Sequence, residues 1–190
     1  MAATFLSFEG IDGSGKSTQA RTLAETLRGL GHTVCLTREP GGSTGAEEIR
    51  RLVLEGEADR WSTETELLLF TAARRDHLEK TIRPALARGE VVITDRFADS
   101  SRIYQGLTRG DMRQTVDRLH DLMIGTEPDL TILIDIDPAL GLARATARAG
   151  AEMRFEDMGL AVQEKARTGV LAPAVTHPRR FRVIDGARPA

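Results

Sequence analysis

Residues 4–18 read TFLSFEGIDGSGKST, and this stretch decides the fold. Thr4 to Phe8 predicts a short buried strand, because β-branched and aromatic residues cluster there. After Lys16, apolar residues recur at the spacing of a helix, at Ala20, Leu23, Ala24, Leu27 and Leu30. Between the two elements lies the pattern GxxxxGK[ST], which in a strand–loop–helix context is typical of a phosphate-binding loop. The stretch therefore predicts that the chain binds a nucleotide by its phosphates.

The residue types in this loop suit an anion. Glycine has no Cβ, so backbone N–H groups can converge on a phosphate. The helix that follows adds the positive end of its dipole. We expect Lys16 to reach the β and γ phosphates and the Ser17 hydroxyl to join a Mg²⁺ shell made mostly of water and phosphate oxygen. The alternative, a chance glycine-rich turn, is disfavoured by the flanking strand and helix. The predicted phosphate site comprises Gly10, Ile11, Asp12, Gly13, Ser14, Gly15, Lys16, Ser17 and Thr18.

Composition indicates a globular protein. The chain has 190 residues, 41% hydrophobic and 28% charged, which predicts a single domain over 1–190. Its net charge of −2 argues against a nucleic-acid or membrane partner, and no stretch approaches a membrane-spanning length. The single cysteine, Cys35, excludes a disulfide within the chain and favours the reducing cytoplasm.

Four more apolar runs follow the first strand. They predict strands over 32–37, 90–95, 130–136 and 180–184, with helices between them. Strands that alternate with helices predict an α/β fold of three layers, in which a five-stranded parallel sheet has helices on both faces. One helix is expected over 63–88, opened by a Thr63–Glu66 capping box and kinked at Pro84.

Further apolar residues are predicted to face the core from the helices. They are Ile49, Leu52 and Val53 in the helix that ends at Leu54, and Val116, Leu119, Leu122 and Met123 in a later amphipathic helix.

Polar residues follow the third predicted strand directly. Carboxylates at the carboxyl ends of parallel strands lie where open α/β sheets bind ligands. Asp95 is therefore predicted to hold Mg²⁺ with Ser17, and Arg96 to bridge phosphates. An Asp–Arg surface pair is the alternative. Hydroxyl and amide groups follow at Ser100, Ser101, Tyr104 and Gln105.

A second set of side chains could hold a flat base. Phe70 and Arg74 are four residues apart and share a helix face. A core phenylalanine beside a solvated arginine is the alternative. After the second strand, Pro40 keeps Glu39 extended next to two glycines, in a loop that either approaches a ligand or forms a polar turn.

Three arginines lie close together near 150. Arg144 and Arg148 are four apart, and Arg154 follows a break at Gly150. They predict either a lid over phosphates at about 144–157 or a solvated helix face.

Taken together, these segments resemble the bacterial thymidylate kinases over nearly the whole chain. The segments that carry the resemblance are FEGIDGSGKST at 8–18, TREPGG at 37–42, FTAARRDHL at 70–78, TDRFADSSRIYQG at 94–106, PDLTILIDIDP at 128–138, RFED at 154–157 and FRVIDG at 181–186. The resemblance implies a homodimeric enzyme that phosphorylates dTMP to dTDP with ATP and Mg²⁺, a step in dTTP synthesis.

The resemblance also implies residue roles. The ATP site would comprise the loop, Arg144 and Arg154, and the catalytic residues would be Lys16, Arg96, Arg148 and Asp12. The dTMP site would comprise Asp12, Arg38, Glu39, Pro40, Phe70, Arg74, Arg96, Ser100, Ser101, Tyr104 and Gln105. Within it Phe70 would stack on thymine, Arg74 would hydrogen-bond the base, and Arg38 and Arg96 would grip the acceptor phosphate. Ser101 and Gln105 would touch the base edge, and Tyr104 would crowd the sugar 2′ position.

Three features depart from the family pattern. Phe97 stands where many members have Tyr or His, and the segment between Arg148 and Arg154 is short and apolar. The given sequence ends at Ala190, soon after Gly186, where members usually continue in another helix. This difference would either expose a face of the sheet or leave adenine contacts to the backbone near 185–188. Three other functions are compatible with a phosphate loop: a kinase of AMP, CMP or UMP, a GTPase switch, and a non-catalytic nucleotide-binding module. The switch is disfavoured because no Asn-Lys-x-Asp segment selects guanine.

Overall fold

The computed structural model of the protein describes residues 3–57, 59–108, 111–147 and 159–188. At its centre is a five-stranded sheet in the order β2-β3-β1-β4-β5, and every strand pair is parallel. The strands are β1 Thr4–Glu9, β2 Val34–Arg38, β3 Val91–Asp95, β4 Leu130–Asp135 and β5 Phe181–Asp185. The predicted parallel sheet is therefore confirmed.

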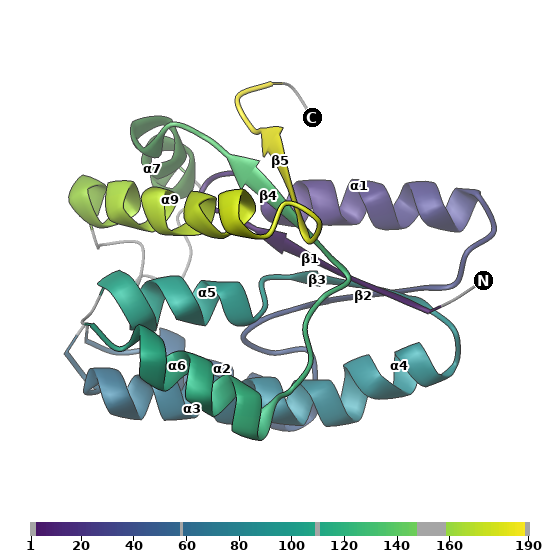
Figure 1. The fold of residues 1–190 in the computed structure, drawn as a ribbon, viewed down its shortest axis with the longest axis horizontal. Helices are drawn as coiled ribbons and strands as arrows, with labels where there is room; N and C mark the ends of the chain where they lie inside the picture. The colour runs from purple at the N-terminus through teal and green to yellow at the C-terminus, as the bar shows by residue number, and fades with distance from the viewer. Residues whose placement is uncertain (1–2, 58, 109–110, 148–158, 189–190) are drawn as a thin grey trace.

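Helices cover both faces of this sheet, as predicted (Figure 1). They are α1 Lys16–Gly29, α2 Thr44–Leu54, α3 Thr63–His77, η1 Leu78–Ile82, α4 Arg83–Ala87, α5 Ala98–Ile103, η2 Tyr104–Thr108, α6 Arg113–Met123, α7 Pro138–Thr146 and α9 Gly159–Thr176. Alternate residues of β1 point to opposite faces. Phe8 packs with Ala20 of α1, whereas Phe5 packs with Leu78 and Ile82 of η1. In the described parts of the chain, no helix is both long and apolar enough to span a membrane.

The helical run predicted over 63–88 is present but subdivided. The α-helical hydrogen bonding gives way to the π-helix η1 over Leu78–Ile82, and α4 begins at Arg83, next to Pro84, which has no N–H to donate. The predicted capping box is wrong. Ser62 caps α3 by accepting from the Thr65 N–H at 3.2 Å, and Glu66 is buried elsewhere.

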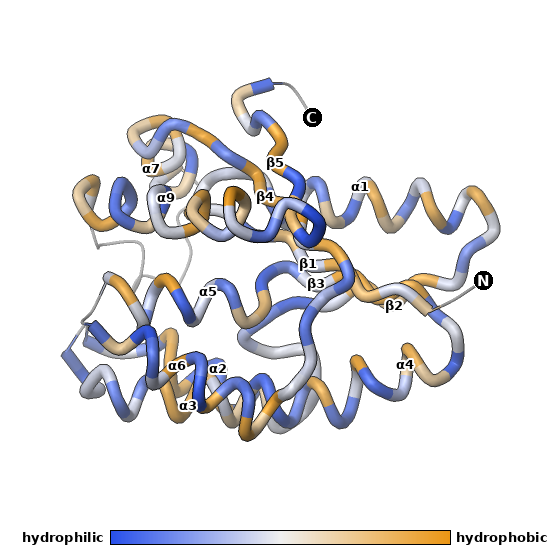
Figure 2. The backbone as a smooth tube through the Cα atoms, in the orientation of Figure 1, coloured by the Kyte–Doolittle hydropathy of each residue, from blue (hydrophilic) through white to orange (hydrophobic). Residues whose placement is uncertain are grey.

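Three apolar residues that were predicted to face the core are exposed instead. Leu122 and Met123 of α6 are 76% and 47% exposed, and Leu52 of α2 is 40% exposed. Leu68 on the neighbouring helix α3 is also exposed. Figure 2 shows the helices alternating between hydrophobic and hydrophilic residues. In α6 the apolar residues extend from the buried Val116 to the exposed Leu122 and Met123, so the apolar set is wider than the buried face.

Candidate active site

The loop after β1 has the backbone that its glycines predict. Gly13 has φ +76°, and a Cβ there would lie 1.9 Å from the carbonyl oxygen of Gly141 in α7. Gly10 has φ +145°, and its Cβ would lie 2.5 Å from the Ile134 carbonyl oxygen. A side chain at either position would force the loop away from α7 or β4, so the phosphate loop depends on both glycines.

Lys16 lies buried inside this loop. Its Nζ donates to the Ile11 carbonyl oxygen at 2.8 Å. Burial and the positive charge of Arg96 lower the pKa of Lys16 to about 8, while Asp12 and Asp95 act in the opposite direction. An anion bound at the loop would therefore favour the protonated, positively charged form of Lys16.

Ser17 and Asp95 lie together where α1 begins and β3 ends. The Ser17 hydroxyl donates to Oδ2 of Asp95. Oδ1 of Asp95 is buried and has no hydrogen-bond partner among the described residues. Mg²⁺ is commonly held by one or two protein oxygens, with water and phosphate completing its shell. The hydroxyl and the unpartnered carboxylate oxygen of this pair therefore fit a Mg²⁺ whose shell is completed by water and nucleotide phosphate. The described residues contain no group of three His, Cys, Asp or Glu that could hold a metal by themselves.

Arg96 joins the loop to the helix that follows β3. Its guanidinium forms an ion pair with Asp12, donates to Ser100 Oγ at 3.0 Å, and lies over the Tyr104 ring at 5.2 Å. Burial opposes ionisation of Asp12, but Arg96 and Lys16 lower the pKa of its carboxyl below the usual value. Arg96 is therefore held at the loop instead of lying on the surface.

A cavity opens next to Arg96. Its lining comprises Asp12, Glu39, Pro40, Arg50, Leu54, Phe70, Arg74, Arg96, Ser100, Ser101, Tyr104 and Gln105. All of these except Arg50 and Leu54 were predicted to bind ligand. Residues from four separate sequence segments therefore converge beside the phosphate loop.

Arg74 is buried at the inner wall of the cavity. Its Nε donates to Glu39 Oε2 at 2.7 Å, and its NH2 donates to the Phe97 carbonyl oxygen and Ser101 Oγ, both at 3.1 Å. His77 Nδ1 lies 3.0 Å from the other Glu39 oxygen. Burial raises the pKa of the Glu39 carboxyl, but Arg74 and His77 outweigh burial and lower this pKa below its usual value. The alternative of a solvated arginine does not hold, because Arg74 is buried and fixed by this network.

Phe97, which departs from the family pattern, supports this arginine. The Arg74 guanidinium lies 5.3 Å from the centre of the Phe97 ring. The same ring meets Phe5 edge-on, with 5.0 Å between ring centres. A fully buried apolar ring at this position therefore ties the inner wall of the cavity to the core beneath β1.

At the other end of the cavity, Phe70 is half-buried and Gln105 is buried. Gln105 Nε2 donates to Glu66 Oε1 at 2.8 Å. Glu66 and His77 do not line the cavity but bond residues that do, Gln105 and Glu39 respectively. Neither was predicted as a site residue. Helical spacing was the only available signal, because it places Glu66, Phe70, Arg74 and His77 on one side of α3.

The remaining predicted residues lie elsewhere. Arg38 is half-exposed, donates to Glu47 at 3.1 Å, and does not line the cavity. Arg144 donates to the Gly186 carbonyl oxygen at 3.0 Å, on the helix that packs against the loop. Arg148 and Arg154, with most of the predicted lid, fall outside the described residues.

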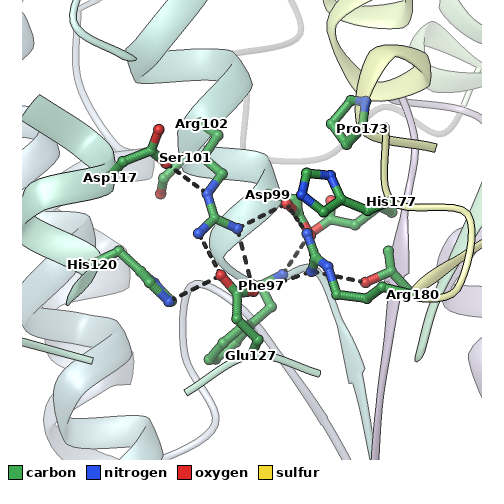
Figure 3. A network of polar contacts seen from close by, with 12 residues as sticks. Phe97, Asp99, Ser101, Arg102, Asp117, His120, Glu127, Pro173, His177 and Arg180 are labelled. Atoms are coloured by element: carbon green, nitrogen blue, oxygen red, sulfur yellow. Dashed lines mark hydrogen bonds and ion pairs between the residues drawn. The ribbon is translucent and has the colours of Figure 1, made fainter. Parts of the chain in front are cut away.

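A second polar network holds α5, the helix that follows Arg96 (Figure 3). Asp99 accepts from Arg102 at 2.9 Å and from Arg180 at 2.8 Å. Glu127 also binds both arginines, and His120 lies 3.2 Å from it. These bonds join α5 to α6 and to the start of β5, and so fix the helix on which Ser100 and Ser101 stand.

The chain has a phosphate loop after β1, a carboxylate at the end of β3 and an arginine between that loop and the cavity. These features together define a P-loop nucleotide kinase. Comparison with known proteins narrows this class. The family model for thymidylate kinase matches residues 8–190, and the chain belongs to the thymidylate kinase family.

Similar proteins cover almost all of the chain. A thymidylate kinase of Ruegeria pomeroyi is 71% identical over 184 residues, which are 97% of this chain and 87% of the relative. One of Dinoroseobacter shibae is 67% identical, over 97% of this chain and 89% of the relative. The crystal structure of the thymidylate kinase from Ehrlichia chaffeensis matches with a TM-score of 0.80 and 36% identity, covering 97% of this chain and 93% of that one.

Proposed function

We propose that this chain transfers the γ-phosphate of ATP to dTMP and releases ADP and dTDP, a step in dTTP synthesis. The observation that carries the proposal is the meeting of the phosphate loop and the Phe70–Arg74 cavity at Arg96 and Asp12. The loop supplies a site for the donor phosphates, and the cavity supplies a site for the acceptor nucleotide.

In the acceptor site, Phe70 stacks on thymine and Arg74 hydrogen-bonds the base. The fixed position of Arg74 supports this role, because three buried hydrogen bonds leave its guanidinium little freedom. Ser101 and Gln105 contact the base edge, and Tyr104 crowds the sugar 2′ position and favours deoxyribose. Glu39, Pro40 and Ser100 complete the wall, and Arg38 reaches the acceptor phosphate from outside it.

At the phosphates, catalysis depends on positioning and charge neutralisation. Lys16 binds the β and γ phosphates, and Arg96 bridges the acceptor phosphate and the group in transfer. Asp12 faces the sugar 3′-OH or the metal near the acceptor phosphate. Mg²⁺ at Ser17 and Asp95 supplies further positive charge to the phosphates.

The donor side includes the remaining arginines. We infer that Arg144 and Arg154 contribute to ATP binding and that Arg148 supplies the catalytic charge, because residues 12–14 contain no arginine. The three belong to a lid over 144–157 of a single domain spanning 1–190.

The enzyme is further proposed to be a cytoplasmic homodimer. Apolar residues exposed on three neighbouring helices support a dimer face: Leu52 on α2, Leu68 on α3, and Leu122 and Met123 on α6. A mass measurement in solution tests the dimer. A mass equal to that of one chain, at the protein concentrations used in the activity assay, would contradict it.

Substrate choice is tested by an assay that couples ADP release to NADH oxidation, with ATP, Mg²⁺ and each of dTMP, dCMP, AMP and UMP. We expect dTMP to support turnover far above the others. Equal rates with all four monophosphates would refute the assignment, and ATP turnover without any acceptor would indicate a different reaction.

A further inference from the structure

Glu9, the last residue of β1, is a buried carboxylate to which the proposed chemistry assigns no role. It is 1% exposed. Its Oε1 accepts from the Phe97 N–H at 2.8 Å and from the Ser100 N–H at 3.3 Å, and its Oε2 accepts from the Ser100 hydroxyl at 2.6 Å. The donors are Phe97, the N-cap residue of α5, and Ser100 in the first turn of that helix. Burying a carboxylate is costly unless it is hydrogen-bonded, and here three donors satisfy it.

The start of α5 that Glu9 holds follows Arg96 directly. Arg96 has φ +73°, in the left-handed region that residues with side chains rarely adopt. Such a conformation persists only where surrounding contacts impose it. The Phe97 and Ser100 N–H groups lie just beyond Arg96, and Glu9 binds both. Glu9 therefore fixes the backbone from which the arginine side chain starts.

A second link runs through side chains. Arg96 NH1 lies 3.0 Å from Ser100 Oγ, and that hydroxyl also lies 2.6 Å from Glu9. A hydroxyl has one hydrogen. Because the Ser100 hydrogen is donated to Glu9, the oxygen presents a lone pair to the guanidinium. Glu9 thus orients the acceptor that holds Arg96.

We propose that Glu9 is a positioning residue that holds the Arg96 guanidinium in place for the phosphoryl group in transfer, through the backbone of residues 96–100 at the start of α5 and through the Ser100 hydroxyl. The inference rests on the proposed function and deepens it. A carboxylate suits the position because both of its oxygens accept hydrogen bonds, one from the two N–H groups and one from the Ser100 hydroxyl. Glutamine has one oxygen, so either the two N–H groups or the hydroxyl would face its NH₂ group.

Opposing influences act on the charge of the Glu9 carboxyl. Burial and the Asp99 carboxylate raise the pKa of Glu9 to about 7, while Arg96 and the bonds from Ser100 and Phe97 lower it. Lys16 and Tyr104 also interact with its charge. Arg96 therefore helps to keep ionised the carboxylate that positions it.

The test is a double-mutant cycle on kcat/KM for dTMP. Glu9→Gln should lower kcat/KM by about tenfold to a hundredfold in the wild-type background, the scale of a misplaced catalytic group. In an Arg96→Ala background it should change kcat/KM less than about twofold, because no arginine is left to position. Glu66→Gln is the matched control: it alters a buried carboxylate that bonds Gln105 and should act by the same factor in both backgrounds. Equal factors for Glu9→Gln in both backgrounds would overturn the proposal.

Two further measurements distinguish a failure of the role proposed for Glu9 from a failure of the proposed dTMP kinase activity. The Nε–H resonance of Arg96, identified by its loss in Arg96→Ala, should shift or broaden in Glu9→Gln and stay in place in Glu66→Gln; an unmoved resonance overturns the role of Glu9. Wild-type protein without activity on dTMP would refute the function while the resonance still decides the positioning. If Glu9→Gln does not fold, Ser100→Ala removes the side-chain link alone. It should show a smaller loss with the same non-additivity, and additivity there counts against the proposal.

Discussion

Replacing Arg74 by methionine should destabilise the protein and weaken dTMP binding together. Arg74 and Glu39 form an ion pair at 2.7 Å, with side chains that are only 6% and 4% exposed. Methionine keeps most of the apolar stem but removes the charge and its three hydrogen bonds. The Glu39 carboxylate would then remain buried with His77 as its partner.

The size of the effect follows from that burial. Removing one partner of a buried ion pair costs about 3–5 kcal/mol, and the remaining His77 contact favours the lower end of this range. A loss of about 3 kcal/mol is large against a total stability of about 5–15 kcal/mol. Adding Glu39→Gln should recover about 1–3 kcal/mol, because no unpaired charge is then buried.

Urea unfolding gives the free energy of each variant, and the slope m shows whether the unfolded states are comparable. Arg75→Met on the same helix is the control. Its pair with Glu79 is 42% exposed on both sides, so the change should cost about 0–1 kcal/mol. Equal stability of the Arg74 and Arg75 variants, or a double variant less stable than Arg74→Met, would refute the reasoning.

Three other changes test the chemistry. Arg96→Ala should lose at least about 2 kcal/mol of transition-state stabilisation, measured from kcat/KM, and an unchanged value would remove Arg96 from the mechanism. Phe70→Ala should raise the KM for dTMP more than the KM for ATP; the reverse order would place Phe70 at the donor site. Because the pKa of Lys16 is lowered to about 8 in the free enzyme, kcat/KM for ATP should fall as pH rises through 8 and the ammonium loses its proton. A profile that stays flat to about pH 10, near the ordinary lysine pKa, would contradict this.

The fold and most of the cavity lining could be predicted because their signals are local. The phosphate loop is a contiguous pattern, and its glycines have the positive φ that the pattern requires. Phe70 and Arg74 share a helix face through a spacing of four residues. Asp95 ends a strand, and strand ends meet at one edge of a parallel sheet.

The supporting residues could not be predicted in the same way. Glu9 binds residues about ninety positions away, and the bond between Glu66 and Gln105 spans 39 positions. Such partners depend on the packing of several elements and leave no spacing pattern. A local rule instead placed Glu66 in a capping box, and burial against Gln105 overrode it. Leu122 and Met123 were predicted to be buried but are exposed. An apolar stripe shows that one face of a helix is hydrophobic, but it does not show whether another element covers that face.

The most direct test of the account is a crystal structure with dTMP and a non-hydrolysable ATP analogue bound together. We expect thymine on Phe70 within reach of Arg74, the analogue's phosphates on the loop at Lys16, and the Arg96 guanidinium between the two nucleotides. A structure with dTMP outside that cavity, or with Arg96 turned away from both phosphates, would contradict it.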